Sequence, residues 1–166
     1  VKKKIVFVGD SGVGKTSIIT RFNNNDFLNG QTTTIGTNFI TKPYINDKVK
    51  LSLYIYDTAG QERFDSLSKL YYRDADVMII VYSVNAPASY TKIPKYLKFI
   101  SETLPITTPI IIVGNKSDLE KKVNSDDAHA LASSEKVDFL ECSAKTSEGI
   151  DELFKKQGTS EKIIKI

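Results

Sequence analysis

The chain is organised around residues 4–17, which read KIVFVGDSGVGKTS. A short, mainly apolar run typical of a buried strand leads into a glycine-rich loop, and an amphipathic helix pattern follows the loop. Gly9, Gly14, Lys15 and Thr16 have the spacing of a phosphate-binding loop, in which glycine is followed by four residues and then by Gly-Lys-Ser or Gly-Lys-Thr. The stretch therefore predicts a strand, an anion-binding loop and a helix in succession, which is the beginning of an α/β fold.

The residue types in this loop suit a bound phosphate chain. Gly12 and Gly14 carry no Cβ atom, so the backbone can curl around an anion and point its N–H groups at it. The Lys15 ammonium would lie against the outer phosphates, and the Thr16 hydroxyl would bind Mg²⁺. A chance glycine turn would need neither the strand before it nor the apolar stripe that continues to Phe22. We assign phosphate binding to Ser11, Gly12, Val13, Gly14, Lys15, Thr16 and Ser17.

The composition is that of an ordinary globular protein and limits the expected partners. The 166 residues are 40% hydrophobic and 26% charged with a net charge of +3, and we expect one domain over residues 1–166. No dense basic stripe with interleaved aromatic residues is present, so nucleic acid is not an expected partner. We see no membrane-spanning run or secretion signal. Cys142 is the only cysteine, which favours a reducing compartment, and we expect it to be a buried small hydrophobe rather than a nucleophile.

Apolar runs bounded by turn signals predict six strands, and helical patterns alternate with them. This order predicts an α/β fold of three layers, with a six-stranded, mostly parallel sheet, one antiparallel edge strand from a hairpin, and helices on both faces. The expected strands are residues 4–8, 38–45, 49–56, 77–82, 110–113 and 137–141.

Five helices are expected between and after these strands. They cover residues 15–23, 66–73, 89–103 and 125–134, and a last segment with the apolar stripe Ile150, Leu153 and Phe154. Pro94 would lie in the first turns of the third helix or kink it. Residues 125–127, Ser-Asp-Asp, would cap the fourth helix, and Gly158 would interrupt the last one.

Four polar clusters directly follow predicted strands. In a mostly parallel sheet the carboxyl ends of the strands share one edge, and ligands bind there. We therefore expect the clusters to meet at a single rim. They are residues 9–16, 57–61, 115–118 and 143–145.

The second cluster carries groups suited to a metal-bound triphosphate. Asp57 follows an apolar strand, where phosphate-loop enzymes keep a carboxylate near Mg²⁺. Gly60 can bring a backbone N–H close to the terminal phosphate, and Gln61 can orient an attacking water. Thr34, in an earlier polar loop, could complete the Mg²⁺ ligands only when a γ-phosphate is present, so that loop would order with the triphosphate. A plain surface turn is the alternative for residues 57–60.

The third and fourth clusters suit recognition of guanine. The Asp118 carboxylate can accept hydrogen bonds from the N1–H and the exocyclic amine of guanine, and adenine lacks this pair of donors. Lys116 can lay its stem over the base, and Asn115 can tie its loop to the phosphate loop. Backbone N–H groups would reach the base carbonyl from the other side, in the segment Ser143, Ala144 and Lys145.

Over essentially its whole length the chain resembles the small GTPases of the Ras superfamily, and it is most similar to the Rab family. The segment between Asp118 and Ser143 is too short for the extra helix of the Rho group. The motifs that carry the resemblance are GDSGVGKT at 9–16, TIG at 34–36, DTAGQERF at 57–64, YYR at 71–73 and ECSAKT at 141–146.

The resemblance implies a P-loop GTPase G domain that binds GTP or GDP with Mg²⁺ and slowly hydrolyses GTP as a molecular switch in vesicle or membrane trafficking. By similarity, Gln61 is the catalytic, water-positioning glutamine and Phe27 packs on the guanine. Thr34 is the Mg²⁺-sensing threonine of the first switch, Thr16 is a second metal ligand, and Asp57 holds the metal through water.

The resemblance also implies partners. An exchange factor, an activating protein that supplies an arginine, and effectors bound through Phe39, Tyr56, Tyr71 and the two switch loops are expected. No arginine is placed to act in cis, and Arg21 is expected to have a solvent or packing role. The implied protein is a cytoplasmic monomer, at the cytosolic face of an intracellular membrane when full length. The lipidated cysteines of the family are absent, so either a tail after Ile166 is missing or this protein does not anchor in that way.

Four positions depart from the Rab pattern without touching its nucleotide contacts, so they bear on the effector and on the Rab subgroup. Asn38 replaces an acidic residue, Tyr56 a tryptophan, Asp74 a glycine and Ser83 a common aspartate. A phosphate-loop kinase or ATPase would need an adenine site, against which residues 115–118 argue. A guanine-nucleotide-binding module with little or no hydrolysis, and another Ras-superfamily signalling GTPase, are the remaining alternatives.

Overall fold

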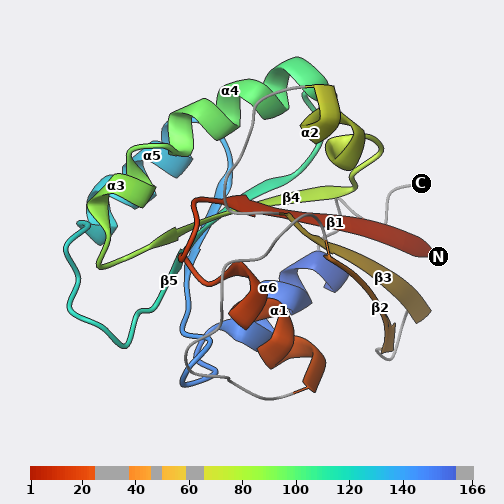
Figure 1. Cartoon of the computed structure of the whole chain (residues 1–166), viewed down its shortest axis with the longest axis horizontal. Coiled ribbons are helices and arrows are strands. Elements are labelled where there is room, and N and C mark those ends of the chain that lie inside the picture. The colour runs from red at the N-terminus through yellow and green to blue at the C-terminus, as the bar shows by residue number, and fades with distance from the viewer. Residues whose placement is uncertain (25–37, 46–49, 59–65, 160–166) are drawn as a thin grey trace.

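The sheet has the strand order β2-β3-β1-β4-β5-β6 and carries helices on both faces (Figure 1). The computed structural model describes residues 1–24, 38–45, 50–58 and 66–159. All six predicted strands are confirmed, with ends that differ by one or two residues. They are β1 (Lys2–Gly9), β2 (Asn38–Ile45), β3 (Lys50–Asp57), β4 (Val77–Ser83), β5 (Ile110–Asn115) and β6 (Asp138–Glu141).

Parallel pairing dominates the sheet, as predicted. β1 pairs in parallel with β3 on one side and with β4 on the other, and β4, β5 and β6 continue in parallel. β2 is the antiparallel edge strand and forms the hairpin partner of β3. β4 is buried along its whole length, which explains its uninterrupted apolar sequence, because helices cover both faces of a central parallel strand.

Alternate residues of the strands feed two cores, one on each face of the sheet. In β1, Ile5 and Phe7 belong to one core, and Val6 and Val8 belong to the other. The first core lies under α1 (Lys15–Asn24) and α6 (Ile150–Thr159). Figure 1 shows the other face, covered by α2 (Ser66–Tyr72), α3 (Pro87–Tyr90), α4 (Ile93–Thr103) and α5 (Ser125–Ser134).

Residues 89–103 are mostly helical, as predicted, but the segment holds parts of two helices rather than one. α3 ends at Tyr90 and α4 begins at Ile93. Pro94 lies in the first turn of α4, where its missing N–H removes no helical hydrogen bond. Of the two roles considered for this proline, the first-turn position is therefore the correct one.

Two further helix predictions are corrected at helix ends. α5 is capped by Asn124, whose side chain accepts a hydrogen bond from the Asp126 N–H at 2.8 Å, rather than by residues 125–127. The Ser125 hydroxyl instead donates to the Glu141 carboxylate. α6 runs to Thr159, so Gly158 does not interrupt it. Among the described helices, none has the length and hydrophobicity that a bilayer crossing requires.

Four of the described residues with side chains adopt the left-handed backbone conformation that favours glycine, namely Asp74, Lys116, Lys136 and Ser147. Asp74 has φ of 58°, which accounts for the glycine usual at this position in the Rab pattern. Lys136 has φ of 55° just after α5. Its N–H donates to Ser133 O at 3.2 Å, and the Val137 N–H donates to Ala132 O at 2.9 Å. These bonds form a Schellman motif, whose left-handed position is normally a glycine.

We predict that Lys136→Gly raises the free energy of unfolding by about 1 kcal/mol, because the left-handed conformation costs a residue with a Cβ atom roughly 1–2 kcal/mol and glycine little. Lys98→Gly is the matched control, since exposed Lys98 lies inside α4, where glycine should lower the stability by about 1 kcal/mol. Urea unfolding measures both changes. A destabilised Lys136→Gly protein would contradict this reading of the α5 end.

Candidate functional site

The polar clusters lie at the carboxyl ends of four strands. β1 ends at Gly9, β3 at Asp57, β5 at Asn115 and β6 at Glu141. All these ends lie on one edge, because the four strands run parallel to one another. The contacts described below join the clusters directly, so the structure brings them together at one rim.

The phosphate-loop backbone has the geometry that its glycines require. Gly12 and Gly14 adopt left-handed conformations, with φ of 79° and 95°. A Cβ atom on Gly14 would lie 2.3 Å from the Asn115 amide nitrogen, so a side chain is excluded there. A Cβ atom on Gly12 would meet nothing within 4 Å, so this part of the loop faces open space. The two left-handed glycines give the loop the tight curve that lets backbone N–H groups face an anion.

Lys15 lies inside this curve at the start of α1. Only 5% of the residue is exposed, and its ammonium donates to Gly9 O and lies 3.5 Å from Asp10 O. An ammonium enclosed by a loop at a helix N-terminus offers positive charge to a phosphate from two sources. Ser11 is exposed on the outside of the loop, and Ser17 is half-buried in the first turn of α1.

Thr16 and Asp57 form an oxygen pair suited to Mg²⁺. The Thr16 hydroxyl donates to Asp57 Oδ2, and Asp57 is 3% exposed at the end of β3. A hydroxyl and a carboxylate are hard oxygen ligands, and Mg²⁺ commonly takes one or two of these from the protein and the rest from phosphates and water. The described residues hold no group of three or more His, Cys, Asp or Glu side chains that could bind a metal by themselves. The donor set therefore fits a cation shared with a phosphate chain.

Asn115 joins the phosphate loop to the loop after β6. Its amide donates to Val13 O at 2.9 Å, and its carbonyl oxygen accepts from the Ala144 N–H at 3.3 Å. The residue is 1% exposed. Lys116 adds a second tie, because its ammonium donates to Gly12 O at 2.7 Å. The loop after β5 thus holds both neighbouring loops in place.

Asp118 and Ser143 connect the two segments predicted to read a base. The Ser143 hydroxyl donates to Asp118 Oδ1 at 2.7 Å and accepts from the Thr146 N–H at 3.1 Å. Ser143 is completely buried, whereas Asp118 is exposed at the rim. The Lys121 ammonium pairs with the Glu141 carboxylate next to this junction. The carboxylate of Asp118 is therefore fixed in direction while remaining open to a ligand.

The expectation of a solvent or packing role for Arg21 was incomplete. Its Nε–H donates to Ala144 O at 2.7 Å, and its Nη2–H donates to Lys145 O at 2.8 Å. Sequence reasoning also missed Lys92, whose ammonium pairs with the Asp10 carboxylate of the phosphate loop at 2.8 Å. These partners lie 82 to 124 residues apart in the chain, so no local pattern indicates them.

Cys142 is the buried residue that the sequence predicted. It is completely buried, and its sulfur lies 3.6 Å from Asn115 Oδ1. Burial, with smaller contributions from Glu141 and Glu148, raises the pKa of its thiol to about 12. A thiol with this pKa is neutral near pH 7, so Cys142 is not a nucleophile in the folded protein.

Four predicted site residues lie outside the described part of the chain. The roles of Phe27, Thr34, Gly60 and Gln61 stay predictions. The remaining predicted nucleotide and metal residues lie on the rim described above.

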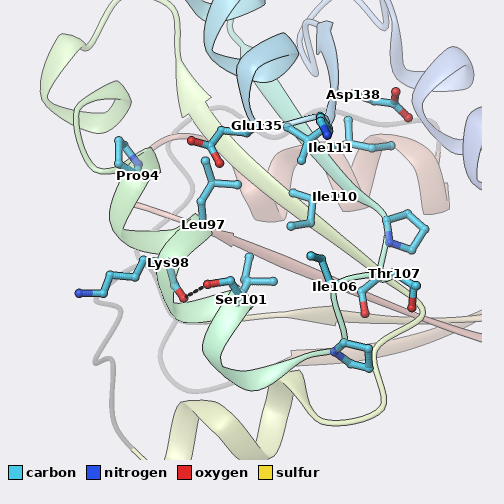
Figure 2. Close-up of a pocket in the computed structure, with 16 residues that line it drawn as sticks. Pro94, Leu97, Lys98, Ser101, Ile106, Thr107, Ile110, Ile111, Glu135 and Asp138 are labelled. Carbon is cyan, nitrogen blue, oxygen red and sulfur yellow. Dashed lines mark hydrogen bonds between the residues drawn. The ribbon is translucent and has the colours of Figure 1, made fainter.

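A separate cleft of about 790 Å³ lies at the opposite end of the sheet (Figure 2). α4 lines one side with Leu97, and the beginning of β5 lines the other with Ile110 and Ile111. Ile106 is fully exposed in the loop below them. None of the predicted site residues lines this cleft, so it belongs to a different surface from the rim.

Comparison with known proteins matches most of the chain to one family. The model of the Ras family matches residues 4–162. GTP-binding protein ypt5 of Schizosaccharomyces pombe is 39% identical over 158 residues, which cover 93% of this chain and 75% of the relative. Ras-related protein Rab-15 of Homo sapiens is 39% identical over 91% of this chain and 72% of its own. Ras-related protein SEC4 of Saccharomyces cerevisiae is 39% identical over 91% of this chain and 71% of its own.

We predict that Asn115→Ala lowers the free energy of unfolding by about 2–3 kcal/mol, because it leaves the buried Val13 carbonyl and Ala144 N–H without their partner. Asn23→Ala is the control, since Asn23 is exposed and its amide donates to the side chain of the exposed Asn24, so the change should stay within about 0.5 kcal/mol. Urea unfolding compares the two variants. Equal losses in both would mean that the amide of Asn115 does not hold the loops together.

Proposed function

The chain belongs to the Ras family of small GTPases and lies close to its Rab members, and from this premise we propose that the rim binds GTP or GDP with Mg²⁺ and hydrolyses GTP. As a Rab-like GTPase it acts as a molecular switch in vesicle trafficking. The observation that carries the site assignment is the bridge through Asn115, which joins the phosphate loop at Val13 to the loop at Ala144. A nucleotide spanning the two loops would lie with its phosphates at one and its base at the other.

The base is read by Asp118 and the loop after β6. The guanine N1–H and exocyclic amine donate to the Asp118 carboxylate in this proposal. The hydrogen bond from the Ser143 hydroxyl, which orients that carboxylate, supports the assignment. Within residues 143–145, a backbone N–H group donates to the base carbonyl. Lys116 and Phe27 cover the base from the two sides. Adenine would leave the carboxylate without its two donors, so GTP is preferred over ATP.

Phosphates and metal are held at the start of α1. The N–H groups of residues 11–17 and the Lys15 ammonium would surround the phosphate chain, and Thr16, Thr34 and Asp57 would hold Mg²⁺, Asp57 through water. When bound, the ion neutralises negative charge on the outer phosphates. Lys15 and the loop N–H groups stabilise the charge that spreads over the γ-phosphate in the transition state. Gln61 orients the attacking water, and the Gly60 N–H contacts the γ-phosphate.

Intrinsic hydrolysis is slow because the described arginines have other partners. Arg21 binds the carbonyls of Ala144 and Lys145, and Arg73 at the end of α2 pairs with the exposed Asp74. An arginine supplied by an activating protein would accelerate hydrolysis by roughly 10³- to 10⁵-fold. An exchange factor would replace GDP by GTP.

An aromatic surface on β2 and β3 is the proposed effector site. Phe39 is 47% exposed, and its ring centroid lies 5.5 Å from that of Tyr54 and 5.0 Å from that of Tyr56. Lys4 lies over the Tyr56 ring at 4.6 Å. Tyr71 of α2 completes the set of aromatic residues assigned to effectors. Exposed clustered aromatic rings are characteristic of protein interfaces.

The remaining proposals concern the organisation of the protein. Residues 1–166 form one G domain, which acts as a monomer. Membrane association at the cytosolic face would come from a lipidated tail and not from the described helices.

We predict that the nucleotide released from the denatured protein has the mass of GDP or GTP.

We predict that Asp118→Asn shifts the base preference of the protein from guanine towards xanthine. The Asn amide can donate to the C2 carbonyl of xanthine, whereas it lacks the charge that pairs with the guanine donors. Competition between GDP and xanthosine diphosphate measures the shift. Asp138→Asn removes the same charge from an exposed position at the far end of the sheet and should change neither affinity. An unchanged base preference in Asp118→Asn would remove Asp118 from the base site.

We predict that Gln61→Leu leaves the affinity for GTP nearly unchanged and slows phosphate release at least tenfold, because leucine cannot orient water by hydrogen bonds. A single-turnover measurement of phosphate release, started by adding Mg²⁺ to the GTP complex, checks the rate. Equilibrium binding of a non-hydrolysable GTP analogue serves as the control. If the two proteins release phosphate equally fast, Gln61 has no part in positioning the water.

A further inference from the structure

The first helix reaches from the phosphate loop to the loop after β6. Lys15 begins α1, and Arg21 lies six residues further along the same helix. The guanidinium of Arg21 holds two consecutive carbonyls, Ala144 O at 2.7 Å and Lys145 O at 2.8 Å. A planar guanidinium that donates two hydrogen bonds fixes direction as well as distance. One side chain thus sets the orientation of the backbone at residues 144 and 145.

This orientation decides where a neighbouring N–H group points. The Ala144 carbonyl and the Lys145 N–H belong to one peptide unit, and all described peptide bonds are trans. In a planar trans peptide the C=O and N–H bonds point in opposite directions. Since the carbonyl points to Arg21, the Lys145 N–H points away from α1.

The neighbouring N–H groups of this loop are already occupied. The Ser143 N–H donates to Glu148 O at 2.9 Å, the Ala144 N–H to Asn115 Oδ1 and the Thr146 N–H to Ser143 Oγ. Within the described residues no acceptor is found for the Lys145 N–H, and Lys145 is exposed. Among the N–H groups of residues 143–146, that of Lys145 is therefore the one left for a ligand.

We propose that Arg21 is a positioning residue for guanine recognition, because it turns the 144–145 peptide so that the Lys145 N–H can donate to the base carbonyl. The inference rests on the proposed function, in which this loop reads the carbonyl at C6. It also gives α1 a second task, since the helix that presents the phosphate site at Lys15 orients a base donor through Arg21.

The loop has other anchors, so it should fold without Arg21. Ser143 is bonded to Asp118, Asn115 holds the Ala144 N–H, and Phe22 of α1 stacks on Phe154 of α6 with ring centroids 3.5 Å apart. Loss of Arg21 would release the rotation of one peptide and leave these contacts in place. The effect should therefore appear in the recognition of one base atom rather than in the whole nucleotide.

The test compares GDP with 6-thio-GDP, in which sulfur, a weak acceptor, replaces the C6 oxygen while the N1–H and the amine remain. The wild-type protein should prefer GDP by about tenfold, the value of one good hydrogen bond. Arg21→Gln should weaken GDP binding by about that factor and leave 6-thio-GDP binding nearly unchanged, so that the preference disappears. Arg21→Lys keeps the charge and the aliphatic stem but not the two-pronged contact, and should show most of the same loss.

Controls separate this role from a structural one. Lys95→Gln removes a positive charge from an exposed position on α4 and should keep the wild-type preference for GDP. Thermal unfolding shows whether each variant is folded, and Arg21→Lys carries the test if Arg21→Gln does not fold. Equal weakening of both nucleotides in the Arg21 variants would overturn the inference. A wild-type protein that binds GDP and 6-thio-GDP equally would instead overturn the assignment of this loop to the base carbonyl.

Discussion

The buried side chain of Asn115 is the constraint on which the rim depends. A buried amide must have its donor and its acceptor satisfied, because an unpaired polar group in the interior costs about 1–3 kcal/mol. Here the donor is satisfied by Val13 and the acceptor by Ala144. The two loops can therefore not separate without breaking bonds to the same side chain. Gly14 is part of this requirement, since a Cβ atom there would lie 2.3 Å from the Asn115 nitrogen.

The sheet register places Asn115 where it can make these bonds. Gly9 of β1 pairs with Val81 of β4, so β4 runs two residues beyond the end of β1. Ser83 pairs with Asn115, so β5 ends level with β4 and beyond the end of β1. The phosphate loop then folds over the end of β5. Electrostatics add to the same arrangement, because Lys116 and Lys92 bind groups of the phosphate loop from outside. The exposed ion pair of Lys92 with Asp10 contributes little stability by itself, and Lys116 adds one exposed hydrogen bond to Gly12 O, so the buried amide carries most of the connection.

Most of the fold could be predicted from the sequence, because the strands are buried and therefore apolar, and because phosphate-loop chemistry demands an unusual spacing. The predictions that were wrong concern helix ends, where more than one residue or more than one conformation fits the local sequence. Asn124 and Ser125 are both good capping residues, and only the packing of Ser125 on Glu141 selects Asn124. The break between α3 and α4 was hidden for a similar reason, since proline is compatible with a first turn and with a kink. In the candidate site, the phosphate-binding and base-binding motifs could be predicted from the sequence. The contacts of Arg21 could not, because they join segments more than a hundred residues apart and no local sequence pattern indicates them.

The position of Cys142 has a consequence for studying motion at the rim. Its sulfur touches the same Asn115 carbonyl that holds the loop after β6, and its raised pKa keeps the thiol neutral and unreactive in the closed state. The thiolate of Cys142 can then attack an alkylating reagent only when this junction opens briefly, so the rate of chemical labelling measures those openings. Because Cys142 is the only cysteine of these 166 residues, the labelling rate reports local opening beside the base loop alone.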